Sequence, residues 1–193
     1  MKMKRILCLL LALLMLPVLA MPAAAADQVT ILFTHDLHSC LQPATDENGV
    51  SYGGYARLMT AINRQKELHP DALLVDGGDF SMGSLFQTIY STDAAELRLL
   101  GLMGFDATTF GNHEFDFRPE GFASMLDAAV ASGDPLPVVV EANYHPPVLG
   151  DEGYGPTAEL LWTAYQNYGV EQNYFVVERG GVNFAIFGTN GLD

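Results

Sequence analysis

The stretch that decides the fold, Gly111-Asn112-His113-Glu114-Phe115-Asp116, stands just after a short apolar run of the chain. Two further polar groups, Asp36-Leu37-His38 and Gly77-Gly78-Asp79, also follow apolar runs that are typical of buried strands. Ligands of open α/β sheets bind beyond the carboxyl ends of the strands. We therefore expect the three groups to meet at one edge of a single sheet.

Runs rich in β-forming residues and helical periodicities alternate on both sides of these groups. The runs that predict strands are Val29–Thr34, Ala72–Val75, Ala107–Phe110 and Pro137–Val140. The apolar stripes that predict helices contain Tyr55, Leu58, Met59 and Ile62; Leu97, Leu100 and Met103; Phe122, Met125, Leu126 and Ala129; and Leu161, Ala164, Tyr165 and Tyr168. This alternation predicts an α/β fold with right-handed crossovers and a mostly parallel sheet.

The ends of several elements can also be predicted. Asp93, with a Glu three residues later, is a candidate N-cap for the second helix, and Gly133 and Gly169 end the last two helices. Residues 174–187 contain two apolar segments joined by two glycines, which is typical of a β-hairpin. Residues 143–157 are rich in Pro, Gly and Asp and are predicted to form a surface loop.

Four side chains at the expected sheet edge are candidate metal ligands. Asp36 and His38 are two residues apart, so an extended backbone would direct both side chains to the same face and toward one metal ion. Asp79 follows two glycines, which allow a tight turn that brings its carboxylate between two cations, and Asn112 offers an amide oxygen to the second cation. Such oxygen and imidazole donors suit Mn²⁺, Zn²⁺, Fe or Co²⁺, and affinity order does not choose among them.

His113 lies beside these ligands and is left over for chemistry, which together with a metal site indicates metal-assisted phosphoester hydrolysis. Each motif is weak alone, because a Gly-Asp pair after a strand is usually a turn and Asn112 is also compatible with a helix N-cap. The specificity comes from the order, the spacing and the equivalent placement of the motifs after successive strands. Cys40 is either a further ligand or a small side chain in a loop, and the second interpretation is favoured.

Several segments resemble the calcineurin-like metallophosphoesterases, and within them the exported bacterial branch of 5′-nucleotidases and 2′,3′-cyclic-nucleotide phosphodiesterases. The matching segments are Ile31–His38, Gly53–Leu58, Leu74–Asp79, Asp106–Phe117, Pro137–Asn143 and Gly180–Gly188. The resemblance implies an α/β fold that forms the N-terminal half of a four-layer α-β-β-α sandwich. It also implies 5′-nucleotidase-type hydrolysis of a phosphomonoester by a hydroxide that bridges two divalent metal ions (Mn, Zn, Fe or Co).

The same resemblance implies that His113 and Asp116 are the catalytic residues, with Asp116 orienting His113 toward the phosphoryl group. The chain departs from the family at His35, where nucleotidases commonly have Asn, and we expect a role for His35 at the rim of the site rather than as an added ligand. In the implied ligand set, Asp36 and His38 bind one ion and Asp79 bridges the pair. Asn112 binds the second ion and, with His113, the substrate.

The N-terminal 26 residues have the features of a Sec-type signal peptide. Three basic residues precede an apolar run at 6–20, and a run of alanines suits cleavage after residue 26. A membrane anchor is the alternative, but this run is short for a span that needs about 20 residues. We therefore expect an exported domain at residues 27–193 that is periplasmic, cell-wall-associated or extracellular and is not stably inserted in a membrane.

The predicted mature domain is strongly acidic, with six basic against 23 acidic residues. Such a charge repels nucleic-acid polymers and anionic membranes. The expected partner is therefore a small phosphorylated substrate, such as a nucleotide, that is bound through cations. Cys40 is the only cysteine of this domain, which excludes a disulfide within it.

The candidate ligands supply five contacts, fewer than a pair of metal ions needs, and no histidine follows His145. The chain also ends just after an apolar strand. We therefore expect a longer protein, truncated here on its C-terminal side, and expect the 193 residues alone to be inactive or weakly active. Two alternatives stay open: a cyclic-nucleotide phosphodiesterase or nucleotide-sugar hydrolase with the same centre, and a non-catalytic exported metal-binding module.

Overall fold

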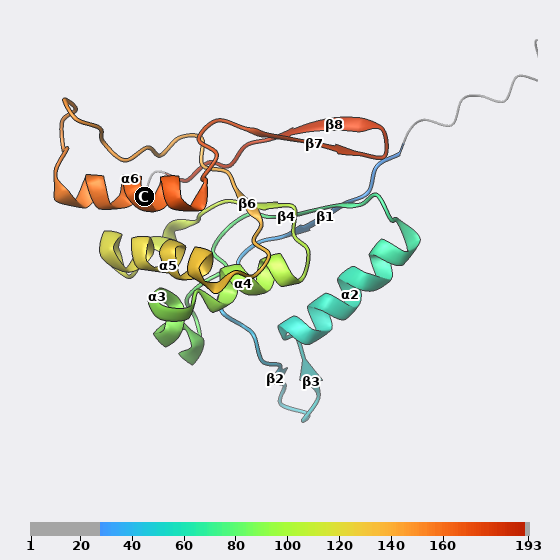
Figure 1. Ribbon diagram of the computed structural model, residues 1–193. Helices are drawn as coiled ribbons and strands as arrows, with labels where there is room; N and C mark the ends of the chain where they lie inside the picture. The colour runs from blue at the N-terminus through green and yellow to red at the C-terminus, as the bar shows by residue number, and fades with distance from the viewer. Residues whose placement is uncertain (1–27, 192–193) are drawn as a thin grey trace, which may run out of the picture.

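The computed structural model describes residues 28–191, and its central feature is a sheet of four short strands (Figure 1). The strands are β1 (Ile31–Thr34), β4 (Leu73–Asp76), β5 (Ala107–Thr108) and β6 (Val138–Val139), in the spatial order β1-β4-β5-β6. Every neighbouring pair is parallel, with Leu32 opposite Leu74 and Ala107 opposite Val138. The predicted α/β class with a mostly parallel sheet is confirmed.

The described residues also form five α-helices and two 3₁₀ helices. They are α2 (Tyr55–Leu68), η1 (Leu85–Ile89), α3 (Tyr90–Asp93), α4 (Ala95–Leu102), η2 (Asn112–Phe115), α5 (Arg118–Ser132) and α6 (Pro156–Tyr168). In Figure 1, α2 to α5 lie on one side of the sheet and α6 lies alongside α5. None of the helices within residues 28–191 is long and apolar enough to cross a membrane. The predicted signal peptide at residues 1–26 lies outside the described part of the chain.

Two helix ends are confirmed and one predicted cap is wrong. Gly133 (φ 71°) and Gly169 (φ 83°) end α5 and α6 in the left-handed conformation that favours glycine. Asp93 does not cap α4, because it is the last residue of α3. The residue between the two helices is Ala94, which is fully buried with a φ of 47° and offers no capping side chain. The tight turn between α3 and α4 therefore replaces the extended N-cap that the sequence pattern predicted.

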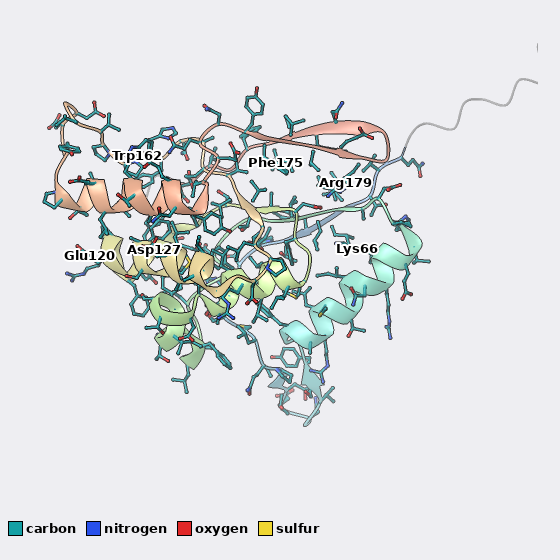
Figure 2. The ribbon with its side chains drawn as sticks, in the orientation of Figure 1. Lys66, Glu120, Asp127, Trp162, Phe175 and Arg179 are labelled. Atoms are coloured by element: carbon teal, nitrogen blue, oxygen red, sulfur yellow. The ribbon has the colours of Figure 1, made fainter. Side chains whose placement is uncertain are left out.

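An antiparallel hairpin lies over the opposite face of the sheet (Figure 1). It consists of β7 (Phe175–Arg179) and β8 (Val182–Ile186), and both glycines of its two-residue turn have positive φ, as predicted. Arg179 pairs with Asp106 at the amino end of β5, and Lys66 of α2 lies on the same flank (Figure 2). A second, smaller ribbon is formed by β2 (Ala44–Thr45) and β3 (Ser51–Tyr52).

An aromatic cluster connects the hydrophobic core to the loop that carries the deciding motif. Phe110 and Phe122 are almost fully buried, with ring centroids 4.8 Å apart. Phe115, in the motif itself, stacks on Phe122 at 4.6 Å. Burial of each such ring contributes on the order of 2 kcal/mol. The cluster therefore fixes η2 against α5 and presents the preceding residues at the sheet edge.

Strand β5 is shorter than the predicted run 107–110, because the chain leaves the sheet after Thr108. The next residues pass directly over the loop that follows β4. A Cβ atom built on Gly78 would lie 2.8 Å from the carbonyl carbon of Phe110 and 2.6 Å from the amide nitrogen of Gly111. Beyond Thr108, this close approach of two backbones replaces the hydrogen-bonded strand pairing that the longer predicted run would have made.

Candidate metal centre

The loops that follow β1 and β4 run side by side beyond the sheet and carry the first three candidate ligands. The amide of Asp36 donates to the carbonyl of Gly78 at 3.0 Å, and the amide of His38 donates to the carbonyl of Asp79 at 3.0 Å. The amide of Ser39 likewise donates to the carbonyl of Phe80 at 2.9 Å. The two loops are therefore held in register by backbone bonds, which places their side chains together.

Ligand atoms of Asp36, His38 and Asp79 all lie within 4.8 Å of one another. The Nδ1 atom of His38 lies 3.3 Å from the carbonyl oxygen of Ser81, so Nδ1–H donates there and the Nε2 lone pair is left for a ligand. That Nε2 atom lies 3.3 Å from Oδ1 of Asp36. Two carboxylates and an imidazole in this arrangement fit a divalent first-row metal ion.

The expectation that Asp36 and His38 sit in extended backbone is wrong. Their φ angles are 53° and 45°, and Ser39, Asp79 and Met82 also have positive φ. Five of the seven non-glycine residues with positive φ in the described part of the chain thus lie in these two loops. The left-handed conformation costs roughly 1–2 kcal/mol per residue. The side chains are brought together by this strained backbone and not by strand geometry.

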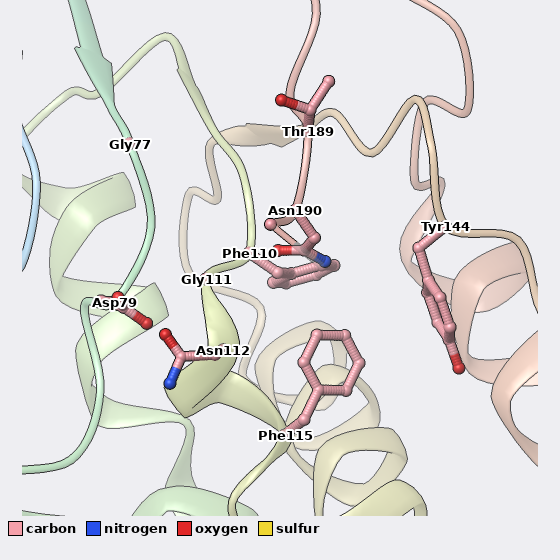
Figure 3. A pocket seen from close by; sticks show the side chains of 10 residues that line it. Gly77, Asp79, Phe110, Gly111, Asn112, Phe115, Tyr144, Thr189 and Asn190 are labelled. Carbon is pink, nitrogen blue, oxygen red and sulfur yellow. The ribbon is translucent and has the colours of Figure 1, made fainter. Parts of the chain in front are cut away.

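The fourth candidate ligand comes from the next strand of the sheet. Asn112 opens η2 just after β5 and lines the same pocket as Asp79, and the side chains of the two residues are directed toward each other in Figure 3. The amide of His113 donates to Oδ1 of Asp79 at 2.9 Å, which joins η2 directly to that carboxylate. The structure therefore brings all four candidate ligands to one edge of the sheet.

The two catalytic candidates form a pair at the same edge. Nδ1 of His113 lies 2.8 Å from Oδ2 of Asp116, and this hydrogen bond raises the pKa of the imidazole above its ordinary value. The His113 ring stands edge-on to His38 with ring centroids 5.0 Å apart, so it faces the candidate ligands without sharing their group. His113 is in position to donate a proton or a hydrogen bond to a molecule bound there.

His35 and Cys40 flank the candidate ligands. Nδ1 of His35 contacts Oδ2 of Asp36, and this hydrogen bond lowers the pKa of the Asp36 carboxyl group. His35 is mostly exposed, which fits the rim position expected for it. Cys40 is an exposed free thiol and does not belong to the group of clustered ligand atoms.

Two buried carboxylates behind the site were assigned no role from the sequence. Asp76, at the end of β4, accepts hydrogen bonds from the hydroxyls of Thr34 and Thr108, at 2.6 and 2.9 Å, and so connects β1, β4 and β5. Burial raises the pKa of Asp76, and it raises the pKa of Glu114 to about 7. A Glu three residues after Gly111 is the spacing of a helix-capping residue, which is the one sequence signal for Glu114.

The open pocket at this edge has a volume of about 490 Å³ (Figure 3). Its polar end is formed by Asp79 and Asn112. Its other walls include the aromatic rings of Phe115 and Tyr144, whose centroids are 5.5 Å apart, and the polar residues Thr189 and Asn190. A polar group and an attached flat or apolar group can therefore be bound side by side.

These features define an α/β domain with a cluster of carboxylate and imidazole groups at the carboxyl ends of parallel strands, in an arrangement that fits a divalent cation. Residues 29–187 match the family described as Calcineurin-like phosphoesterase, and the chain belongs to that family. The resemblance found in the sequence is thereby confirmed.

Individual relatives share part of their length with this chain. The 5′-nucleotidase of Bos taurus is 32% identical over 164 residues, which are 75% of this chain and 28% of that protein. The 5′-nucleotidase precursor from Thermus thermophilus has a similar structure, with a TM-score of 0.63 and 27% identity, over 84% of this chain and 28% of that one. The NAD nucleotidase of Haemophilus influenzae shares the fold, with a TM-score of 0.65 and 24% identity, over 86% of this chain and 26% of that one. The chain thus spans little more than a quarter of the length of these relatives.

Proposed function

We propose that this chain forms the metal- and phosphate-binding part of a metal-dependent phosphoesterase, of the 5′-nucleotidase type. The observation that carries the proposal is the convergence of Asp36, His38 and Asp79 within 4.8 Å, beside Asn112 and the His113–Asp116 pair. The 5′-nucleotidases among the relatives support a small phosphorylated substrate, in particular a nucleotide. The acidity of the chain argues against nucleic-acid polymers as ligands.

The candidate ligands divide between two metal subsites that share Asp79. Asp36 and His38 would hold one ion, Asn112 the other, and the Asp79 carboxylate both. Bound divalent ions at such a site polarise phosphoryl oxygens and lower the pKa of a coordinated water. The oxygen and imidazole donors suit Mn²⁺, Zn²⁺, Fe or Co²⁺ equally in chemical type.

His113 and Asp116 supply the chemistry of the protein itself. The Asp116 carboxylate accepts from Nδ1 of His113, which leaves Nε2 to face the bound phosphoryl group and keeps the ring protonated to a higher pH. The charged ring stabilises the negative charge that develops on the phosphoryl oxygens, or donates the proton that the leaving alkoxide needs. The amide of His113 meanwhile holds Asp79 in place at 2.9 Å.

We also propose that residues 1–26 direct export and that residues 27–193 belong to the exported domain. The basic start, the apolar run and the alanines before Asp27 support this proposal. The family match begins at residue 29, the third residue after the proposed cleavage point. The protein would then act outside the cytoplasm, in the periplasm, at the cell wall or in the medium.

The test is hydrolysis by the full-length protein with added Mn²⁺ or Zn²⁺. The substrates are AMP, p-nitrophenyl phosphate, bis-p-nitrophenyl phosphate and a 2′,3′-cyclic nucleotide. Asp79→Asn removes the shared carboxylate, and Asp71→Asn is the matched control, because Asp71 precedes the amino end of β4 while Asp79 follows its carboxyl end. Metal-dependent hydrolysis that Asp79→Asn abolishes and Asp71→Asn preserves supports the proposal. Hydrolysis without metal, or none by the wild-type protein, overturns it.

A further inference from the structure

Glu114 is a fully buried carboxylate that contacts both loops of the proposed metal pair. Its Oε2 atom accepts from the amide of Asp79 at 2.9 Å and from the amide of Gly111 at 2.7 Å. Its Oε1 atom accepts from the amide and the hydroxyl of Ser81, at 3.0 and 2.7 Å. Four donors thus converge on one side chain: two backbone amides and a hydroxyl from the loop beyond β4, and one backbone amide from the loop beyond β5.

We propose that Glu114 is the positioning residue that fixes the loop of Asp79 against the loop of Asn112 and so holds the two metal subsites as a pair. This inference rests on the proposed function, because it concerns the geometry of the same site. Glu114 has an exposed fraction of 0%, so it acts through the ligands and does not touch substrate or metal itself.

The two loops approach each other so closely at Gly78 and Gly111 that neither position has room for a side chain. A Cβ atom built on Gly111 would lie 2.2 Å from Oδ1 of Asp79, and one built on Gly78 would lie 2.6 Å from the amide nitrogen of Gly111. Asp79 is therefore fixed to the next loop at both ends. Its amide is bonded to Glu114, and its carboxylate accepts from the amide of His113 at 2.9 Å.

The main chain at Glu114 is itself anchored to the core. Its carbonyl oxygen accepts from the hydroxyl of Tyr90 at 2.6 Å, and Tyr90 is fully buried in α3. Its neighbour Phe115 stacks on Phe122 of α5. The side chain of Glu114 therefore connects the metal loops to a fixed point of the hydrophobic core, as a residue that sets a distance must do.

The chemistry of these contacts requires a carboxylate. Four donors surround the Glu114 side chain, and this environment favours its ionised form, which only accepts and takes two donors on each oxygen. Glutamine has almost the same volume but replaces one oxygen with an NH₂ group, which would face the amide of Ser81 or those of Asp79 and Gly111, donor against donor. Alanine would leave the buried amide of Ser81 without this partner, at roughly 1–3 kcal/mol, and the part-buried amides of Asp79 and Gly111 as well. Glu114→Gln is therefore the mildest substitution that breaks the connection.

The experiment measures Mn²⁺ binding by calorimetry, magnetic coupling of the bound Mn²⁺ ions by EPR, and thermal unfolding in chelator, for the full-length protein. Glu141→Gln is the matched control, because Glu141 is also fully buried, is bonded to Asn190 at 3.1 Å, and accepts from none of the four donors of Glu114. In Glu114→Gln we expect the weaker Mn²⁺ equivalent to lose at least about tenfold in affinity and the coupled EPR signal to disappear, as is usual when a partner of a metal ligand is removed. The affinity of the more tightly bound Mn²⁺ ion and the unfolding temperature should change no more than in Glu141→Gln.

Two coupled Mn²⁺ ions bound with wild-type affinity in Glu114→Gln would overturn the inference and leave the proposed function intact. Equal weakening of both equivalents in step with a lowered unfolding temperature would also overturn it, because that result describes a general loss of structure. If Glu114→Gln does not fold, Ser81→Ala decides, since it removes only one donor to Oε1. Selective weakening of the second equivalent by that variant supports the inference, and unchanged binding overturns it. A wild-type protein that binds a single Mn²⁺ overturns both the metal pair and this inference.

Discussion

Gly111→Ala is expected to damage the proposed metal site while leaving the fold nearly intact. Gly111 has φ −99° and ψ −171°, a conformation that alanine adopts freely, so the substitution adds no backbone strain. The added methyl carbon would lie 2.2 Å from Oδ1 and 2.5 Å from Cγ of Asp79. Relief of this overlap requires the carboxylate to move by about 1 Å, and a displacement of that size costs on the order of 100-fold in rate.

The stability cost of Gly111→Ala is expected to be smaller than its functional cost. Overpacking of one methyl group costs about 1–3 kcal/mol in a rigid core. Here two of the three closest contacts are with the part-buried side chain of Asp79, which can move, and the third is with the amide nitrogen of Asp79 at 2.8 Å. The control is Gly155→Ala, at a glycine with φ 176° and nothing within 4 Å of an added Cβ atom. The assay compares kcat/KM on p-nitrophenyl phosphate, bound Mn²⁺ and the unfolding temperature in the two variants. Activity and metal content of Gly111→Ala within about threefold of the control would refute the placement of Asp79.

Three further predictions concern other parts of the site and its surroundings. His113→Ala should lower kcat by about 10²–10⁴ with the bound metal unchanged, and loss of metal in that variant would show that His113 is a ligand. Asp116→Asn replaces the carboxylate that raises the pKa of His113 with a neutral, weaker acceptor, so the imidazolium is lost at lower pH and the alkaline limb of the kcat/KM profile should shift to lower pH. Burial raises the pKa of Glu141 to about 7, so its contribution to stability is present below pH 4.5 and is lost as the pH rises through about 7. The free energy of unfolding of Glu141→Gln, measured relative to that of the wild type, should therefore be higher at pH 8 than at pH 5, by at most about 3 kcal/mol. An equal difference between the two proteins at both pH values would contradict this prediction.

The positions of the site loops could be predicted from the sequence because their signals are local. Short apolar runs followed by polar groups predicted the strands β1, β4 and β5, and the parallel arrangement of these strands then brought Asp36, Asp79 and Asn112 to one edge. Gly133 and Gly169 likewise identified two helix ends, because a left-handed C-terminal residue is a property of a few neighbouring residues.

The roles of the buried carboxylates behind the site could not be predicted, because these roles depend on partners far away in the chain. Glu114 accepts from residues 33 and 35 positions earlier, and Asp76 accepts from Thr34, 42 positions earlier. No local pattern separates such a carboxylate from one on the surface. The left-handed backbone of Asp36 and His38 was missed for the same reason, since neighbouring loops and not residue type impose it.

The left-handed residues of the two ligand loops set a limit on how the protein can be engineered. Ser39 and Met82 have positive φ without being candidate ligands, but both side chains are buried. The Ser39 hydroxyl donates to Oε1 of Glu96 at 2.6 Å, and Met82 belongs to the hydrophobic core. Glycine at either position would relax the backbone but would also remove a buried hydrogen bond or leave a cavity. A thermostable variant should therefore be sought through the hairpin or the outer helices instead.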